Sequence, residues 1–391
     1  MHKYLILILT LGLTIKLQAQ SSMEDILQSV LQNNTELKAY SSQIDSKHLS
    51  FKTGLTPANP EVEYENSFSS AEGKPYEITI SQAFDFPTSY IYRHQISKDR
   101  IKSLEYFRTQ KRQEILLETQ LTCLEMIFLR KKNHELVKRA ENAQKLFSLY
   151  KKRLEEGDAT ILDLNKVKMA VVNTSHRLKI NSTKLVNLEK ALIKLNGNQA
   201  ISFKEKDYNA VDLPNSFSEL SQQLLPMDPV NLVLQNEQRI AQKEISLSKA
   251  EALPKWSIGY RFLNSDLGKS SNGLKLGLSI PLWENRNKVR QSKQNLHYLE
   301  QNLSVHQLTI QSEMEQLYLN CQSLKQSLQD YKKSFAGINT TALLTKAVKM
   351  GEISSIEYFM ELSYYYDSYD AYLEVEQEYH KTVAQLKRFN L

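Results

Sequence analysis

Histidine and cysteine, the side chains that most often bind metals or carry nucleophilic catalysis, are sparse in this 391-residue chain. The eight histidines are scattered without metal-ligand spacing, and neither Cys123 nor Cys321 has a histidine one helical turn away. The sequence also contains no phosphate-binding glycine loop and no nucleophile elbow. We therefore predict that the protein is not an enzyme, and we assign it no catalytic residue, no cofactor and no metal.

Carboxylates do occur in one regular arrangement, in which a glycine is followed directly by one acid and six positions later by another. The arrangement appears once in each half of the chain, as Gly157, Asp158 and Asp163 and then as Gly351, Glu352 and Glu357. Each glycine is predicted to end a helix and reverse the chain, with Thr160 or Ser354 as the next N-cap. Helix termination does not explain why an acid follows each glycine at the same distance. Asp163 and Glu357 could therefore have a functional role, or they could simply be exposed carboxylates on a helix.

The segments that must position these acids occur twice in the chain, because Lys151–Gly197 reappears at Thr345–Leu391 in the same helical phase. A heptad series follows each glycine: Leu164, Val171, Leu178, Leu185 and Leu192, and then Tyr358, Tyr365, Tyr372, Tyr379 and Leu386. A period of about 3.5 residues predicts helices wound around their neighbours. We predict a first structural repeat over 20–215 and a second over 216–391. The tyrosines are expected to fill seams between helices, with a stacking ladder for aromatic cargo as the alternative.

Long helices are predicted for most of both repeats. Only 11 glycines and 9 prolines occur, and 24% of the residues are charged, which is typical of helices that meet water widely. The first repeat is predicted to contain helices over 22–53, 88–156 and 160–196, and the second to contain a helix over 228–253 and a very long one after Pro281. At 1.5 Å per residue the helix over 88–156 would extend roughly 100 Å, which no compact single-core domain holds.

Four short segments alternate apolar and polar side chains, the pattern of strands with two different faces. In the first repeat the apolar positions are Val62, Tyr64 and Phe68, opposite Glu61, Glu63 and Glu65, and then Tyr76, Ile78 and Ile80, opposite Glu77, Thr79 and Ser81. In the second they are Trp256, Ile258, Tyr260 and Phe262, opposite Ser257, Gly259 and Arg261, and then Leu274, Leu276, Leu278 and Ile280, opposite Lys275, Gly277 and Ser279. Polar loops over 70–75 and 264–273 predict two hairpins.

Four such strands make an incomplete membrane structure, because an open sheet edge in lipid leaves backbone groups unpaired at several kcal/mol each. The smallest closed membrane barrels have about eight strands, and side chains fill their interior. If the strands span a membrane, we therefore predict a symmetric homo-oligomer, and a pore would need three or more copies. Phe84, Phe86, Trp256 and Trp283 fall at the same end of the hairpins, as in an aromatic girdle at a membrane interface. The alternative is a water-soluble β-sandwich with these aromatic rings in its core.

The first 19 residues have the pattern of a secretory signal peptide, with Lys3 before an apolar run over 4–17 and Ala19 at the exit. We expect an exported mature chain that starts near Gln20. Beyond Ala19 no apolar run reaches the length of about 18 residues that a membrane helix needs. The net charge of +6 is spread along both repeats, so no nucleic-acid partner is predicted. For Cys123 and Cys321 we expect small half-buried helix positions, with a disulfide as the alternative.

The whole mature chain resembles the TolC-like outer-membrane efflux protein family. The segments that carry the resemblance are Asn34–Leu37, Pro57–Val62, Phe84–Pro87, Ser279–Trp283 and the two glycine turns, in this order and duplicated behind a signal peptide. The resemblance implies a mainly α fold with a small β part, in which duplicated long helical hairpins form an α-barrel. The four strands of each chain would contribute to a trimeric twelve-stranded transmembrane β-barrel.

The resemblance also implies a function, that of a passive conduit exporting small toxic compounds or metal cations. The implied location is the outer membrane of a Gram-negative bacterium, with the helical part in the periplasm. The implied partners are identical copies in a homotrimer, outer-membrane lipid, a periplasmic adaptor (membrane fusion) protein and an inner-membrane efflux pump. The short chain and the proline after the first hairpin are most similar to the ducts of heavy-metal RND efflux systems. The alternative function is a periplasmic coiled-coil adaptor or structural spacer without its own pore.

In this family the helix tips narrow the inner entrance of the channel. The implied periplasmic tip or gate residues are Gly157, Asp158, Asp163, Gly351, Glu352 and Glu357. Carboxylates ringing a constriction attract cations and repel anions. The family places an aromatic residue three positions before the second glycine and a basic residue two positions after it, whereas Val348 and Ile353 occupy these positions here.

Overall fold

The computed structural model of the chain describes residues 22–66, 75–211, 213–214, 216–264, 269–337 and 339–391. The signal peptide predicted over 1–19 lies outside these residues, as do parts of both predicted hairpin loops. Two compact units can be distinguished, and each draws on both halves of the chain. The first comprises Met1–Thr35, Leu116–Val211 and Ser323–Ala384, and the second comprises Glu36–Ile115, Asp212–Gln322 and Gln385–Leu391. The predicted division into sequence repeats over 20–215 and 216–391 stays a prediction.

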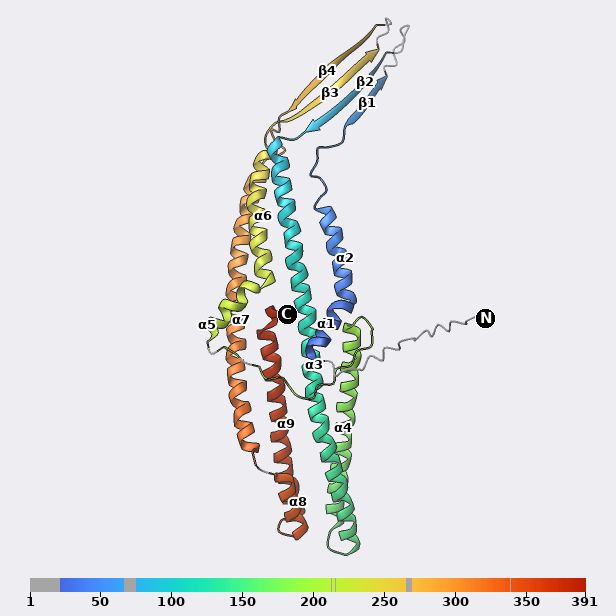
Figure 1. Cartoon of the computed structure of the whole chain (residues 1–391), viewed down its shortest axis with the longest axis vertical. Helices are drawn as coiled ribbons and strands as arrows, with labels where there is room; N and C mark the ends of the chain where they lie inside the picture. The colour runs from blue at the N-terminus through green and yellow to red at the C-terminus, as the bar shows by residue number, and fades with distance from the viewer. Residues whose placement is uncertain (1–21, 67–74, 212, 215, 265–268, 338) are drawn as a thin grey trace, which may run out of the picture. The chain divides into compact units, whose positions relative to one another are not determined.

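Helices form most of the described chain, and the strands form one small sheet (Figure 1). The helices are α1 (Met23–Asn33), α2 (Thr35–Ser50), α3 (Pro87–Glu155), α4 (Ile161–Leu195), α5 (Phe217–Leu224), α6 (Pro229–Glu251), α7 (Lys288–Phe335), α8 (Thr340–Met350) and α9 (Ser355–Leu386), with short 3-10 helices η1 (Leu225–Met227) and η2 (Arg388–Asn390). The mainly α class with a small β part is confirmed. The long helix predicted over 88–156 is also confirmed, because α3 has 69 residues.

The single helix predicted over 22–53 is wrong, because α1 and α2 are separated at Asn34. Asn34 leaves the helical conformation, with φ −55° and ψ 123°. Its side-chain amide donates a hydrogen bond to the carbonyl of Leu195, 2.8 Å away at the end of α4. The break is therefore accompanied by a tertiary hydrogen bond that links it to a segment distant in the sequence.

The very long helix predicted after Pro281 is present as α7, which has 48 residues and ends at Phe335, and a separate helix, α8, begins at Thr340. Gly337 has a positive φ of 75°, a conformation that glycine adopts without steric cost. Asn339 then caps α8 by accepting a hydrogen bond from the backbone N–H of Ala342 at 3.2 Å. A helix stop and a helix start thus follow one another within a few residues.

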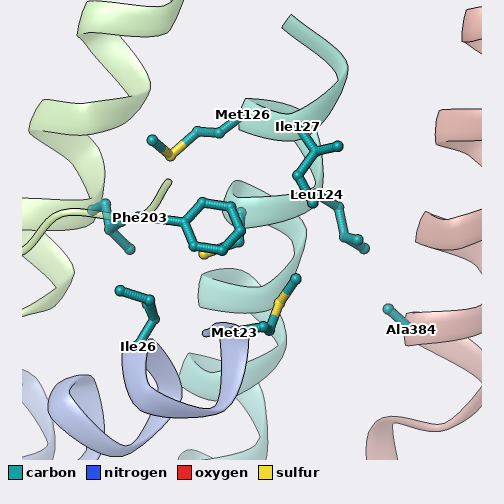
Figure 2. Close-up of a cluster of buried hydrophobic side chains, with 9 residues drawn as sticks. Met23, Ile26, Leu124, Met126, Ile127, Phe203 and Ala384 are labelled. Atoms are coloured by element: carbon teal, nitrogen blue, oxygen red, sulfur yellow. The ribbon is translucent and has the colours of Figure 1, made fainter. Parts of the chain in front are cut away.

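A buried hydrophobic cluster holds α1, α3 and α4 together in the first unit. It comprises Met23, Ile26, Cys123, Leu124, Met126, Ile127, Leu192, Phe203 and Ala384. Figure 2 shows the ring of Phe203, from the segment after α4, lying among side chains of α1 and α3. Burial of such a ring contributes about 1.5–3 kcal/mol. Arg130 fixes the same segment by donating hydrogen bonds to the carbonyl oxygens of Phe203 and Glu205.

The sheet belongs to the second unit and has four antiparallel strands in the order β1-β2-β3-β4. The strands are β1 (Glu61–Asn66), β2 (Tyr76–Phe84), β3 (Lys255–Asn264) and β4 (Ser270–Ser279). Both predicted hairpins are present, as β1 with β2 and β3 with β4. In addition β2 pairs with β3 from Tyr76 opposite Asn264 to Phe84 opposite Trp256. This pairing unites the two hairpins, and β1 and β4 are the edges.

Ion pairs tie the base of the sheet to the adjoining helices of the second unit. The guanidinium of Arg93 in α3 bonds Asp85, just after β2, at 2.7 Å and Glu251, at the end of α6, at 2.9 Å. Further along α3, a hydrogen bond joins the same two helices, because the side-chain amide of Asn236 in α6 donates to the carbonyl of Asp99 in α3 at 2.7 Å. These contacts fix where the strands leave the helices.

Candidate functional site at the glycine turns and on the sheet

Both predicted tip glycines end a helix in the left-handed conformation, with φ 84° at Gly157 and 77° at Gly351. At the first turn the N–H of Asp158 donates to the carbonyl of Arg153 at 2.8 Å, and at the second the N–H of Glu352 donates to the carbonyl of Ala347 at 3.0 Å. These bonds close Schellman motifs, which satisfy carbonyl groups left free at a helix end. The prediction that the glycines reverse the chain is confirmed.

The acids six positions after the glycines have a structural role that the sequence analysis missed. Asp163 accepts hydrogen bonds from the N–H of Thr160 at 3.1 Å and from its hydroxyl at 2.6 Å, while its own N–H donates to that hydroxyl. Glu357 accepts from the N–H of Ser354 at 2.8 Å, and its N–H donates to the hydroxyl of Ser354. Both turns therefore contain a capping box, whose Ser/Thr-x-x-acid pattern was readable in the sequence.

The electrostatics of the turns follow from these hydrogen bonds. The backbone N–H and hydroxyl of Ser354 stabilise the ionised Glu357 carboxylate, so its pKa is lowered. Glu357, Asp158 and Glu352 are exposed, whereas Asp163 is half-buried. Each turn thus holds fixed negative charge at the start of a helix, where the helix dipole favours it. A role of these acids in gating stays a prediction.

The two turns belong to the same unit and share a hydrophobic cluster. Its buried members are Leu146, Tyr150, Val167, Val348, Tyr358 and Leu362, and Ala159 and Ile353 pack against it. The two positions at which the family has an aromatic and a basic partner are therefore occupied by aliphatic side chains engaged in packing. Neither Val348 nor Ile353 offers a polar side chain to Asp163.

Arg153, in the last turn of α3, is a tip residue that sequence reasoning overlooked. Its guanidinium donates hydrogen bonds to the carbonyl oxygens of Val348 at 3.4 Å and Lys349 at 3.3 Å, near the end of α8. A cation at a helix C-terminus is favoured by the helix dipole. The only sequence signal for Arg153 is its position in the last turn before a predicted glycine cap. This position does not reveal which helix end the side chain contacts.

The heptad tyrosines pack between helices. Tyr358 is fully buried, and its hydroxyl accepts a hydrogen bond from Asn142 of α3 at 3.1 Å. Tyr365 and Tyr372 lie against the ring of Phe335, with centroid distances of 6.0 and 5.9 Å. These contacts agree with the expected role in filling seams between helices.

The two cysteines are free and buried, more deeply than the half-buried positions expected from the sequence. Desolvation raises the pKa of Cys123 to about 12 and that of Cys321 to about 12. Since the thiolate is the reactive form, neither side chain is suited to nucleophilic chemistry or metal binding. In the described ranges, no group of three or more histidine, cysteine, aspartate or glutamate residues could hold a metal ion.

One face of the sheet exposes a continuous set of large apolar side chains. These are Val62 and Tyr64 of β1, Ile80 of β2, Trp256, Ile258 and Tyr260 of β3, and Leu274, Leu276 and Leu278 of β4. Leu274 and Leu276 are 80% and 78% exposed, whereas Thr79 on the opposite face is only 2% exposed. Soluble proteins rarely expose so large an apolar patch, which marks an interaction surface. From Lys255 to Tyr260 of β3 the burial alternation is the reverse of that of a soluble sheet, whereas the edge strands β1 and β4 are exposed along almost their whole length.

The four predicted interface aromatics lie at the end of the sheet next to the helices. The rings of Phe84 and Trp256 stack with centroids 4.5 Å apart. Phe86 and Trp283 follow β2 and β4, and they are 37% and 79% exposed. The structure therefore brings two of the four rings, Phe84 and Trp256, into a stacked contact, and Trp256, Phe86 and Trp283 are exposed. Their role as a membrane-interface girdle stays a prediction.

On the opposite, polar face of the sheet, strands approach closely at a glycine. A Cβ atom at Gly259 would lie 2.8 Å from the carbonyl oxygen of Ile80, so only glycine fits there without a shift of the backbone. Nearby, Arg261 of β3 forms an ion pair with Glu77 of β2 at 2.7 Å. The polar face thus combines a close backbone approach with charge pairing across neighbouring strands.

No helix among the described residues combines the length and the apolar character needed to cross a membrane.

Comparison with solved structures identifies the fold. The chain is similar to CusC, whose structures describe transmembrane channel formation, with 13% identity and a TM-score of 0.80 over 94% of this chain and 91% of that one. It is also similar to the outer-membrane channel OprN, with 12% identity and a TM-score of 0.79 over 94% and 89% of the two chains. The third example is the CmeC outer membrane channel of Campylobacter jejuni, with 15% identity and a TM-score of 0.72 over 94% and 85%.

The chain therefore has the fold of these outer-membrane channels, and the TolC-like fold inferred from the resemblance is confirmed. A scan against protein-family models finds no match, and a search of curated protein sequences finds none either.

Proposed function

We propose that this protein is the outer-membrane channel of a tripartite efflux pump, a passive conduit for small toxic compounds or metal cations. The observation that carries the proposal is the exposed apolar face of the four-stranded sheet, in a chain whose fold is that of outer-membrane channels. An exposed apolar face is unfavourable in water but carries no such penalty when it faces lipid. In this proposal the sheet lies in the outer membrane and the helices extend into the periplasm.

The open edges of the sheet favour a homotrimer. Within the described chain no strand pairs with the outer edge of β1 or of β4. In lipid those backbone groups need partners, which further copies of the same sheet supply. Three copies give a closed barrel with a lumen wide enough for a conduit, whereas two would give one filled with side chains.

The glycine turns form the periplasmic end in this proposal, where a periplasmic adaptor and an inner-membrane pump would dock. Beyond the two glycines the charged residues of the turns are acids, Asp158, Asp163, Glu352 and Glu357, whereas basic residues such as Arg153 and Lys349 precede the glycines, and three copies would bring twelve such carboxylates to one end. A ring of this sign favours cations over anions. This supports metal cations or cationic compounds as cargo.

Extraction and conductance test the channel proposal. We expect the full chain to be recovered from the outer-membrane fraction only with detergent, as a trimer, and to conduct ions in planar bilayers. A protein released as a monomer by osmotic shock, without conductance, would instead indicate a periplasmic adaptor or spacer. Deleting the gene and profiling sensitivity to a panel of metals and hydrophobic drugs then identifies the class of cargo.

The role of the tip acids is tested in the same bilayers with Asp163→Ala and Glu357→Ala. If these carboxylates shape the entrance, single-channel conductance rises or the preference for cations falls. Thr160→Ala is the matched control, because it weakens the same capping box and leaves the charge of Asp163 in place. If all three variants conduct ions like the natural chain, a gating role of these carboxylates is contradicted. Only their structural role in the capping boxes then remains.

A further inference from the structure

The two edge strands of the sheet carry opposite charge on the same face. The edge strand β1 contains Glu61, Glu63 and Glu65 and no basic residue, whereas the edge strand β4 contains Lys275 and no acid. The strand register sets Glu61 opposite Ser81, Ser81 opposite Gly259 and Gly259 opposite Lys275. Because facing residues in a sheet project to the same side, the three glutamates and Lys275 lie on the polar face.

Among the described residues these charges have no ion-pair partners. In the part of the chain that the structure describes, none of the three carboxylates forms an ion pair with a basic side chain, and Lys275 pairs with no carboxylate. The interior of the same sheet shows what such residues do when a neighbouring strand is available, since Glu77 and Arg261 pair across β2 and β3 at 2.7 Å. The unpaired charges are therefore concentrated at the two open edges.

The direction of the strands makes the two edges suitable for each other. Since each of the three pairings in the sheet is antiparallel, β1 and β4 run in opposite directions. The β1 edge of one copy can therefore continue the antiparallel ladder beyond the β4 edge of another. A contact between two different edges generates a closed ring when the rotation closes.

The small residues beside Lys275 at the β4 edge also favour contact with the β1 edge of another copy. Gly273 and Gly277 flank Lys275 on the polar face, so no side chain stands beside the lysine on its own strand. The three glutamates recur at every second position of β1, roughly 7 Å apart along the strand. One of them therefore stays within reach of Lys275 when strand tilt shifts the two edges along each other.

We propose that Lys275 of one copy forms an ion pair with the Glu61–Glu65 row of β1 in a second copy of this chain, and that this pairing sets the register of the seam between copies. The proposal rests on the proposed function, because it requires the sheets of several copies to meet edge to edge. It adds the residues that make the seam.

Charge exchange tests the pairing in purified, detergent-solubilised protein. The variants are Glu61→Lys/Glu63→Lys/Glu65→Lys, Lys275→Glu, and the two combined, with trimer dissociation followed by light scattering. We expect either charge change alone to raise the dissociation constant about tenfold, since close charge pairs at interfaces commonly contribute this much or more. The combined variant should recover most of the loss. Independent, additive effects or no effect would overturn the inference.

A covalent test does not depend on stability. In a Cys123→Ser/Cys321→Ser background, Lys275→Cys is paired in turn with Glu61→Cys, Glu63→Cys or Glu65→Cys and treated with a short bismaleimide. The inference predicts cross-linked dimers and trimers for at least one pair, and none for the control Val62→Cys with Lys275→Cys, whose side chains lie on opposite faces. A trimeric, conducting protein without these cross-links would overturn the seam and leave the proposed function intact. A monomer that never conducts would instead contradict the proposed function itself.

Discussion

At the scale of the residue, Asp163 and Glu357 are first of all capping residues. Each lies at the third position of its helix and returns a carboxylate oxygen to the N–H of the N-cap, Thr160 or Ser354. This contact accounts for the acid shared by the two glycine turns. A charge held in this way is well ordered, which is also what an electrostatic filter requires, so the structural and the proposed functional roles are compatible.

The lowered pKa of Glu357 predicts a pH-dependent contribution to stability. A carboxylate whose folded pKa lies below its ordinary value of 4.5 stabilises the fold above that pH, and the contribution is lost as the pH falls through the folded pKa. We therefore expect the Glu357→Gln variant, which cannot ionise, to be less stable than the natural chain at neutral pH. The difference should shrink as the pH is lowered below about 4.5.

Denaturant unfolding of both proteins at several pH values checks this expectation. Ser354→Ala serves as the control, because it removes the hydroxyl that donates to the same carboxylate and accepts from the Glu357 N–H. A stability difference between the natural chain and Glu357→Gln that stays constant down to pH 3 would show that the carboxylate charge plays no part in holding the turn.

At the scale of the element, the two turns require glycine because of its backbone conformation, not because a side chain would lack room. A Cβ atom added at Gly157 or Gly351 would meet nothing within 4 Å, but both residues have positive φ. We expect Gly351→Ala to lower the free energy of unfolding by about 1 kcal/mol, the usual cost of placing an alanine in the left-handed region. Gly273→Ala is the matched control, since a Cβ there is equally free and φ is not positive. Equal stability of the two variants in denaturant unfolding would contradict this account.

The sequence predicts the helices well where long periodic segments are bounded by local signals. Thr160 and Asn196 mark the ends of α4 as predicted, because caps act through neighbouring residues. The break at Asn34 was missed because it involves a hydrogen bond to Leu195, a contact that no local pattern encodes. The pairing of β2 with β3 was not predicted for the same reason, since it joins segments far apart in the chain.

At the scale of the whole molecule, the apolar face of the sheet predicts where a charge is tolerated. Leu276→Arg places a cation on this face, where in lipid it costs about 2–4 kcal/mol near the membrane midplane. We expect this variant to be depleted from the outer-membrane fraction. Ser271→Arg, on the opposite face of the same strand and also exposed, should fractionate like the natural chain. Equal recovery of both variants in the membrane fraction would contradict the assignment of this face to lipid.

The sequence predicts where the candidate site lies, but only part of the contacts that its residues make. The spacing of glycines and acids located both turns correctly, because turn chemistry is local. The packing of Val348 and Ile353 in one hydrophobic cluster, and the contact of Arg153 with the end of α8, depend on how the two turns pack together. Periodicity along a single chain carries no information on such contacts.

The exposed apolar face of the sheet also has a consequence for biogenesis. In the proposed function, each copy displays an apolar surface and two strand edges able to recruit other polypeptides before it reaches lipid, the combination that promotes aggregation. Under the proposed function we therefore expect assembly to need a factor that shields the sheet in the aqueous compartment, and the yield of assembled protein should depend on how quickly this factor delivers the chain.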